Sequence, residues 1–262
     1  MSIYLIYLAV GVVAGLLAGL FGVGGGLIIV AALVMAFKSL GVAPEVLVHL
    51  AVGTSLATII PTSLSSSYTH HQKKGVLWGW FKFIAVGMIA GSLLGAWLAS
   101  QMPGLALQKV IGVFVLLVAA QMVLKLQPKP REVEPETKLL VGAGGVIGWA
   151  SAIFGIGGGT LSVPFLVWCG AAMRQAAGTS AALGFPIAVF GALGYLINGW
   201  NVDLLPEHSL GYVYLPALLG ITLASVPAAR VGAKLAHFLP ELVLKRLFAL
   251  MLVLVGLNLI FF

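Results

Sequence analysis

The stretch FGVGGG at residues 21–26 lies inside a long apolar run, and it returns as FGIGGG at residues 154–159. Glycine weakens a helix because it loses more backbone freedom on folding than any other residue. Both runs fall where the surrounding apolar residues otherwise favour a continuous helix. The sequence therefore predicts a helix break at two corresponding places in the chain.

Composition indicates a membrane protein. The 262 residues are 61% hydrophobic and 8% charged, whereas soluble domains are about 25% charged. Most of the charge-free segments reach the roughly 20 residues that a helix needs to cross a bilayer. These segments are residues 1–37, 46–72, 83–108, 110–124, 139–173, 175–202, 208–229 and 247–262. Because lipid cannot satisfy backbone hydrogen bonds, we predict an all-α polytopic membrane protein embedded in a lipid bilayer.

The chain is an internal duplication. Residues 21–34 and 154–167 share eight of fourteen positions, and AVGTSLATIIP at 51–61 matches AAGTSAALGFP at 176–186. Between the halves lies QPKPREVEPETK, which is rich in proline and charge and predicts an exposed linker. We therefore predict a first transmembrane repeat at 1–126, a cytoplasmic linker at 127–138 and a second repeat at 139–262.

Loop charges distinguish two topologies. If each glycine run only kinks a spanning helix, the halves are parallel and the fourteen basic residues divide seven against seven between the two sides. If each run is the tip of a hairpin, the halves are inverted. Twelve basic residues then lie on one side of the membrane, and only Lys38 and Lys109 lie on the other. The second division fits the enrichment of Lys and Arg in cytoplasmic loops. We predict inverted repeats, each a glycine-broken hairpin followed by three transmembrane helices, with both termini periplasmic. The net charge of +7 then reflects these loops and does not indicate nucleic-acid binding.

In the inverted topology the glycine tips meet near the middle of the bilayer. Residues 27–37 and 160–169 would form short helices whose N-termini point inward, and such ends attract anions through free N–H groups and a partial positive charge. Broken helices in inverted repeats form the substrate sites of many transporters. The alternative is close helix packing, which better explains Gly15, Gly19, Gly87, Gly91 and Gly95. The predicted anion-binding residues are Gly24, Gly25, Gly26, Leu27, Gly157, Gly158, Gly159 and Thr160.

Two further groups of polar residues are candidates. Thr54, Ser55, Thr179 and Ser180 belong to the repeated Gly-Thr-Ser triplets. Their hydroxyls could donate to an anion, or could bond backbone carbonyls of their own helices. His71 and Arg174 lie near predicted helix ends and are candidates for a gating or proton-linked role. No metal or cofactor site is predicted, and the lack of paired carboxylates in apolar segments argues against an enzyme.

The paired motifs resemble the sulfite exporter TauE/SafE family, also described as the four-toluene sulfonate uptake permease group. The resemblance rests on FGVGGG and FGIGGG, each followed by Gly-Thr-Ser and proline, and it covers nearly the whole chain. It implies secondary transport of sulfite, sulfoacetate or another sulfonate across the bacterial inner membrane. The first half departs from the expected pattern, with Ala31 facing Pro164. The alternative function is a small-anion channel, and the sequence is also compatible with a homodimer.

Overall fold

The computed structural model describes residues 2–21, 25–124, 135–236 and 241–261. The described part of the first half forms five helices. They are α1 (Ser2–Phe21), α2 (Gly26–Ser39), α3 (Pro44–Gln72), α4 (Trp78–Ser100) and α5 (Gly104–Leu124). Pro44 begins α3, a position where the missing N–H costs nothing. The predicted short helix at 27–37 corresponds to α2.

The second half repeats this order with one addition. Its elements are α6 (Thr137–Phe154), α7 (Gly159–Trp168), α8 (Met173–Asn198), β1 (Ser209–Leu210), β2 (Val213–Tyr214), α9 (Leu215–Ala236) and α10 (Glu241–Phe261). The antiparallel pair β1 and β2 was not predicted, and it occupies the start of the apolar segment expected at 210–231. Helix α9 consequently begins and ends five residues later than that segment. The predicted short helix at 160–169 corresponds to α7.

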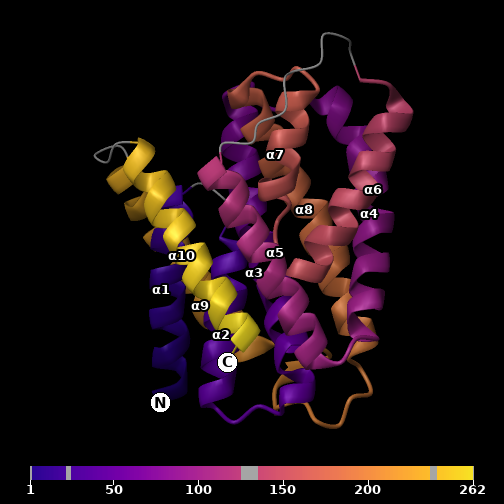
Figure 1. Ribbon diagram of the computed structural model, residues 1–262. Helices are drawn as coiled ribbons and strands as arrows, with labels where there is room; N and C mark the ends of the chain where they lie inside the picture. Colours follow the sequence, from indigo (N-terminus) through magenta and orange to yellow (C-terminus); the bar gives the residue numbers. More distant parts are fainter. Residues whose placement is uncertain (1, 22–24, 125–134, 237–240, 262) are drawn as a thin grey trace.

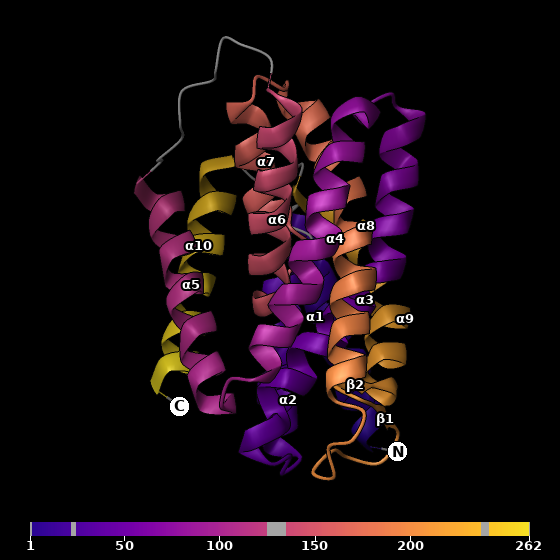
Figure 2. The same ribbon diagram turned by 90° about the vertical axis from the view of Figure 1, so that its right-hand side faces the viewer.

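Each glycine run separates two helices that run in opposite directions. Helix α1 rises from the lower end of the molecule in Figure 1, and α2 returns to that end. Helix α6 descends from the upper end, and α7 returns there (Figures 1 and 2). The described chain thus contains two helical hairpins that enter from opposite ends. Both termini are marked at the lower end in both views.

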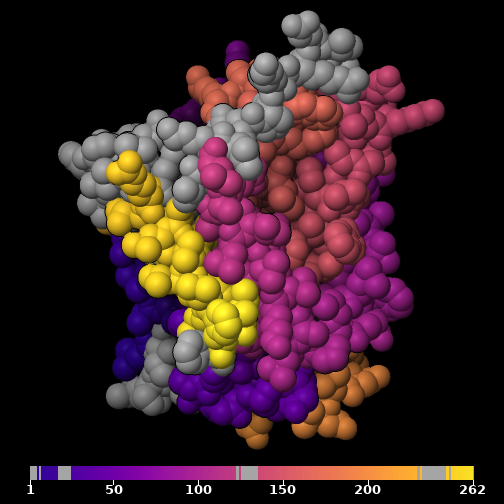
Figure 3. Space-filling view, viewed as in Figure 1, coloured from indigo at the N-terminus to yellow at the C-terminus, as the bar shows by residue number. Residues whose placement is uncertain are grey.

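The predicted polytopic membrane character is confirmed. Helices α3, α4, α6 and α8, together with Gly104–Gln121 of α5, are long and apolar enough to cross a bilayer. Large apolar side chains point outward, as a lipid environment requires; examples are Val86 (62% exposed), Leu117 (63%) and Leu223 (71%). On the face in Figure 3, α10 lies beside α5. In contrast, residues Val46–Ile59 of α3 are all buried, so α3 forms part of the protein centre.

Two helix pairs are packed closely enough that glycine is required, and each pair combines one helix from each half. Helix α1 packs on α9, and α6 packs on α4. A Cβ atom on Gly91 of α4 would lie 2.0 Å from the carbonyl oxygen of Gly145 on α6. A Cβ atom on Gly15 of α1 would lie 2.5 Å from the carbonyl oxygen of Ser225 on α9. The packing interpretation of Gly15, Gly87, Gly91 and Gly95 therefore agrees with the structure. Gly19 has no described side-chain environment.

A buried histidine joins three segments at the lower end. The Nδ1 atom of His49 lies 3.1 Å from the Glu45 carbonyl oxygen, one turn earlier in α3. Its Nε2 atom lies 3.0 Å from the Ala99 oxygen and 3.1 Å from the Met102 oxygen, at the end of α4. The ring stacks on Tyr212, between β1 and β2, with centroids 5.1 Å apart. These contacts connect α3 to both halves of the chain.

Two glycines on α6 provide a direct test of this packing. A Cβ atom on Gly144 would lie 2.2 Å from the Ile84 carbonyl oxygen, whereas a Cβ atom on Gly142 would have no neighbour within 4 Å. We expect Gly144→Ala to destabilise the protein by about 1–3 kcal/mol, because the backbone of α4 must move. Gly142→Ala should be neutral or slightly stabilising, because alanine favours helix. Thermal unfolding in detergent measures both, and equal melting temperatures would contradict the packing.

Candidate functional site

A left-handed glycine starts the second helix of each hairpin. Gly25 precedes α2 with φ 69° and ψ −13°, and Gly158 precedes α7 with φ 77° and ψ −14°. Only glycine adopts this backbone conformation without strain. Neither helix start receives a side-chain cap. The first N–H groups of each helix have no acceptor within the helix, which leaves donors inside the protein at both hairpin tips.

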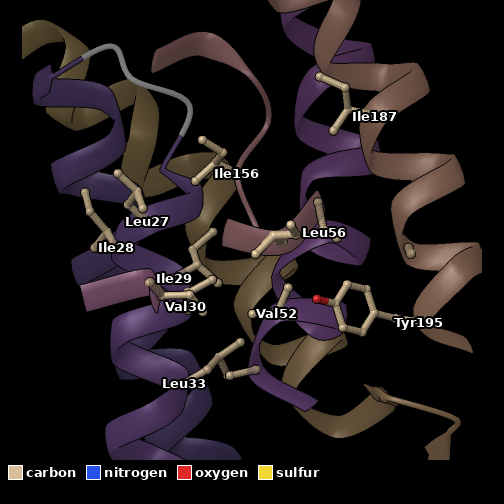
Figure 4. Packing of buried hydrophobic residues seen from close by; sticks show 14 of the residues in the cluster. Leu27, Ile28, Ile29, Val30, Leu33, Val52, Leu56, Ile156, Ile187 and Tyr195 are labelled. Carbon is tan, nitrogen blue, oxygen red and sulfur yellow. The ribbon is translucent and has the colours of Figure 1, made fainter. Parts of the chain in front are cut away.

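The described parts of the two hairpin tips touch. A Cβ atom on Gly26 would lie 2.7 Å from the Gly155 carbonyl oxygen and 2.8 Å from the Ile156 Cα atom. Figure 4 shows Ile156 beside Leu27 at the start of α2. Leu27 is 4% exposed and belongs to the hydrophobic core. The meeting of the two tips, predicted from the duplicated glycines, therefore agrees with the structure.

Ser55 of α3 holds this junction together. Its Oγ atom lies 2.9 Å from the Gly155 carbonyl oxygen and 3.3 Å from the Gly26 carbonyl oxygen. The single hydroxyl proton is therefore shared between the two hairpins, with the shorter contact to Gly155. Ser55, Gly26 and Gly155 are all buried, so the hydroxyl supplies a hydrogen-bond donor where bulk water cannot.

The two helix starts differ in exposure and in their hydroxyl neighbours. Gly25 and Gly26 are buried, whereas Gly157, Gly159 and Thr160 are partly exposed. At the second start, Ser162 Oγ lies 2.8 Å from the Gly158 carbonyl oxygen and 2.7 Å from Ser180 Oγ. Ser180 of α8 is thereby connected to α7 through a hydroxyl chain. The duplicated serines Ser55 and Ser180 both reach the second hairpin, but with different partners.

The duplicated threonines have equivalent contacts with loops of the opposite half. Thr54 Oγ1 accepts a hydrogen bond of 2.9 Å from the Tyr214 N–H, directly before α9. Thr179 Oγ1 accepts a hydrogen bond of 2.8 Å from the Leu77 N–H, directly before α4. Each hydroxyl therefore satisfies a backbone donor at a helix start. This is a structural use of the threonines that neither of the two expected hydroxyl roles described.

The glycine of each triplet permits these contacts. A Cβ atom on Gly53 would lie 2.2 Å from the Tyr212 carbonyl oxygen, and one on Gly178 would lie 2.2 Å from the Gly75 carbonyl oxygen. The loops before α9 and α4 therefore press directly on α3 and α8. Glycine makes room for the loop, threonine accepts its N–H, and serine points toward the second hairpin.

His71 and Arg174 lie together at a different place. Near the end of α3, His71 Nδ1 accepts a hydrogen bond of 3.1 Å from Trp78 Nε1. At the start of α8, Arg174 donates from Nη2 to the Lys73 carbonyl oxygen over 3.1 Å. Both side chains are exposed at the corner between α3 and α4. They do not join the hairpin tips, and their gating role stays a prediction.

The structure brings most of the predicted anion-binding residues to one central region. Ser55 and Ser180 lie against the glycine turns that precede α2 and α7, and Thr54 and Thr179 are directed to loops. Gly24 lies outside the described residues. Sequence reasoning missed Ser151 and Ser162, which lie beside Gly158. It selected polar residues that occur in both halves, whereas these serines align with Ala18 and Ile29. A search for polar residues present in only one copy would have found them.

Nearly the whole chain is similar to known proteins. The family described as sulfite exporter TauE/SafE matches residues 7–259. A "Probable membrane transporter protein" of Haemophilus influenzae is 38% identical over 97% of both chains. A probable membrane transporter protein of Bacillus subtilis is 29% identical, over 94% of this chain and 96% of the relative. Another, of Methanocaldococcus jannaschii, is 26% identical, over 86% of this chain and 84% of the relative. No protein of solved structure matches the chain.

The hydrogen bond between Thr179 and Leu77 predicts a stability effect. Thr179→Val keeps the shape of the side chain but removes the acceptor oxygen. The Leu77 N–H, directly before α4, then has no acceptor. We expect the free energy of unfolding to fall by about 1–2 kcal/mol, while Thr179→Ser retains most of it. Thr69→Val is the matched control, because Thr69 is exposed and bonds only Ser65 of its own helix. A Thr179→Val variant as stable as Thr69→Val would show that the bond contributes nothing.

Proposed function

The chain belongs to the sulfite exporter TauE/SafE family, and we propose that it exports a small sulfur-containing anion by secondary transport. That it is a membrane transporter follows from the family and from the relatives. Sulfite, sulfoacetate or another sulfonate is the proposed substrate. The observation that carries the proposal is the pair of uncapped helix starts at α2 and α7, which lie inside an apolar protein and present backbone N–H donors.

The arrangement of the helices supports alternating access. We propose that the halves are inverted repeats, since one hairpin opens toward each end of the molecule (Figures 1 and 2). A site between hairpins from opposite ends can be reached from either side when the packed helices rock. In this proposal the anion lies between the two hairpin tips, beside the glycine turn before α7.

Charge at the two ends supports an orientation in the bacterial inner membrane. The upper end in Figure 1 contains the end of α3 and the starts of α4, α6 and α8. These segments carry Lys73, Lys74, Lys82, Lys138 and Arg174. The lower loop between α8 and β1 carries Asp203 and Glu207 but no basic residue. By the positive-inside rule we assign the upper end, and with it the linker, to the cytoplasm and both termini to the periplasm.

Cysteine labelling tests this orientation. Lys73 and Asp203 are both exposed, and the native Cys169 is buried. In intact cells whose outer membrane admits the reagent, an impermeant maleimide should label Asp203→Cys and leave Lys73→Cys unlabelled. Disrupting the inner membrane should then expose Lys73→Cys. The reverse pattern would overturn the orientation, and the wild-type chain measures background labelling.

The membrane potential favours export. Moving one negative charge out of a cytoplasm that is 100 mV negative releases roughly 2.3 kcal/mol. In proteoliposomes we therefore expect saturable movement of a sulfur anion toward the positive side, together with counterflow of unlabelled substrate. Sulfite, thiosulfate, sulfoacetate, taurine and sulfate are the substrates to compare. Flux that does not saturate would favour the alternative, a small-anion channel, and transport of none would exclude the proposed substrate class.

Gly158 tests whether the second hairpin tip takes part in transport. A Cβ atom there would lie 2.6 Å from Ile187 Cδ1, and φ is 77°. We expect Gly158→Ala to lower flux at least tenfold while folded protein is still recovered. Gly41→Ala is the matched control, because Gly41 has φ 73° but no neighbour within 4 Å of an added Cβ. It imposes similar backbone strain far from the tips. Equal flux in the two variants would exclude the tip as part of the pathway.

A further inference from the structure

Five buried hydroxyls have no hydrogen-bond partner among the described residues, those of Tyr7, Ser151, Tyr195, Ser209 and Thr222. Of these, Ser151 lies beside the glycine turn before α7. Ser151 of α6 is 0% exposed, and its Oγ atom makes no hydrogen bond. An unpaired buried hydroxyl is costly, because it has lost its bonds to water without replacing them. Beside an uncapped helix start, such a hydroxyl can donate to a bound ligand. Ser151 is therefore the residue from which a ligand site can be located.

The Ser151 hydroxyl is directed at the start of α7. The Cβ position of Gly158, the residue before α7, lies 3.6 Å from Ser151 Oγ and 3.8 Å from Ser162 Oγ. Helix α7 spans ten residues and has no side-chain cap. The N–H groups of Gly159 and Thr160, in its first turn, have no acceptor within the helix. The unpaired Ser151 hydroxyl and the first amides of α7 thus lie around the same glycine turn.

The first hairpin has no hydroxyl at the two corresponding sequence positions. Ala18 and Ile29 stand at the positions that correspond to Ser151 and Ser162. The start of α2 is also covered, because Gly26 lies against the backbone of Gly155 and Ile156. The described parts of the two glycine turns are alike, but an unpaired hydroxyl, that of Ser151, lies beside the second. A site built from these donors can exist once in the molecule.

We propose that the start of α7, with Ser151 as a direct donor and Ser162 and Ser180 behind it, is the single anion site and selects singly charged oxyanions. The proposal rests on the proposed function and narrows its substrate class. The buried polar residues among those described are His, Ser and Thr, without any Lys or Arg. A helix start supplies about half a positive charge. That charge and neutral hydroxyls suit one negative charge but leave the second charge of a dianion uncompensated.

The ligand class that follows is a monoanion with several oxygen acceptors. An alkylsulfonate and hydrogen sulfite each carry one charge and offer oxygens to both amides and hydroxyls. Sulfate carries two charges on the same group, and sulfoacetate carries a second charge on its carboxylate. The site should therefore prefer methanesulfonate and hydrogen sulfite to sulfate and sulfoacetate.

Replacing Ser151 by alanine separates a ligand-binding role from a structural one. Without ligand, the melting temperature of Ser151→Ala in detergent should equal or exceed that of the wild type, because no protein hydrogen bond is lost. Its affinity for methanesulfonate, measured by titration calorimetry, should fall at least about tenfold, as expected for one hydrogen bond to a charged group. Ser92→Ala is the matched control: Ser92 is also fully buried in a helix, but it bonds the Ile89 carbonyl oxygen of that helix.

Four results distinguish failure of this site from failure of the proposed function. If the wild type, Ser151→Ala and Ser92→Ala all transport a sulfur anion at the same rate, the proposed site is overturned but the proposed function is not. Sulfate bound as tightly as methanesulfonate would overturn the charge selection. If the protein binds nitrate but no sulfur anion, and Ser151→Ala weakens nitrate binding, the site is supported and the substrate class is overturned. Wild-type protein that binds none of these anions would overturn both.

Discussion

The constraint on which the structure depends is that a helix interrupted inside lipid must have its backbone groups satisfied by protein. The glycine turns before α2 and α7 create such interruptions, and the described parts of the two tips meet in the centre. Ser55 supplies the donor that joins them, with its hydroxyl 2.9 Å from the Gly155 carbonyl oxygen. The buried length of α3 is needed to position this serine between hairpins that enter from opposite ends. The core therefore exists largely to enclose two broken helices.

The same constraint explains why the halves are interlocked. Helix α1 of the first half packs on α9 of the second, and α6 of the second packs on α4 of the first. Thr54 and Thr179 then accept the N–H groups that precede α9 and α4. A motion that separated the sequence halves would break both sets of contacts. For the proposed alternating access, the bodies that rock are therefore better sought in these mixed helix pairs than in the two repeats themselves.

The features that could be predicted from the sequence are mainly those that occur in both halves of the chain. The doubled FGxGGG pattern was sufficient to predict both breaks, the short helices after them and the meeting of their tips. The triplets were identified as important, but the sequence could not show that their threonines accept N–H groups from loops 102 and 160 residues away. The strands β1 and β2 were missed because two residues each carry no periodic signal. Contacts between distant segments of similar apolar composition are not encoded in local pattern.

Features that occur in only one copy carry the most specific chemical information. Duplication produces two hairpin tips with nearly the same turn geometry, so symmetry alone would predict two equal anion sites. The second tip, however, is partly exposed and surrounded by Ser151, Ser162 and Ser180, whereas the start of α2 is buried against Gly155 and Ile156. Two anions held close together in an apolar interior would also repel each other strongly. The single site proposed at the second tip avoids this repulsion, because the start of α2 is closed by the backbone of the second hairpin.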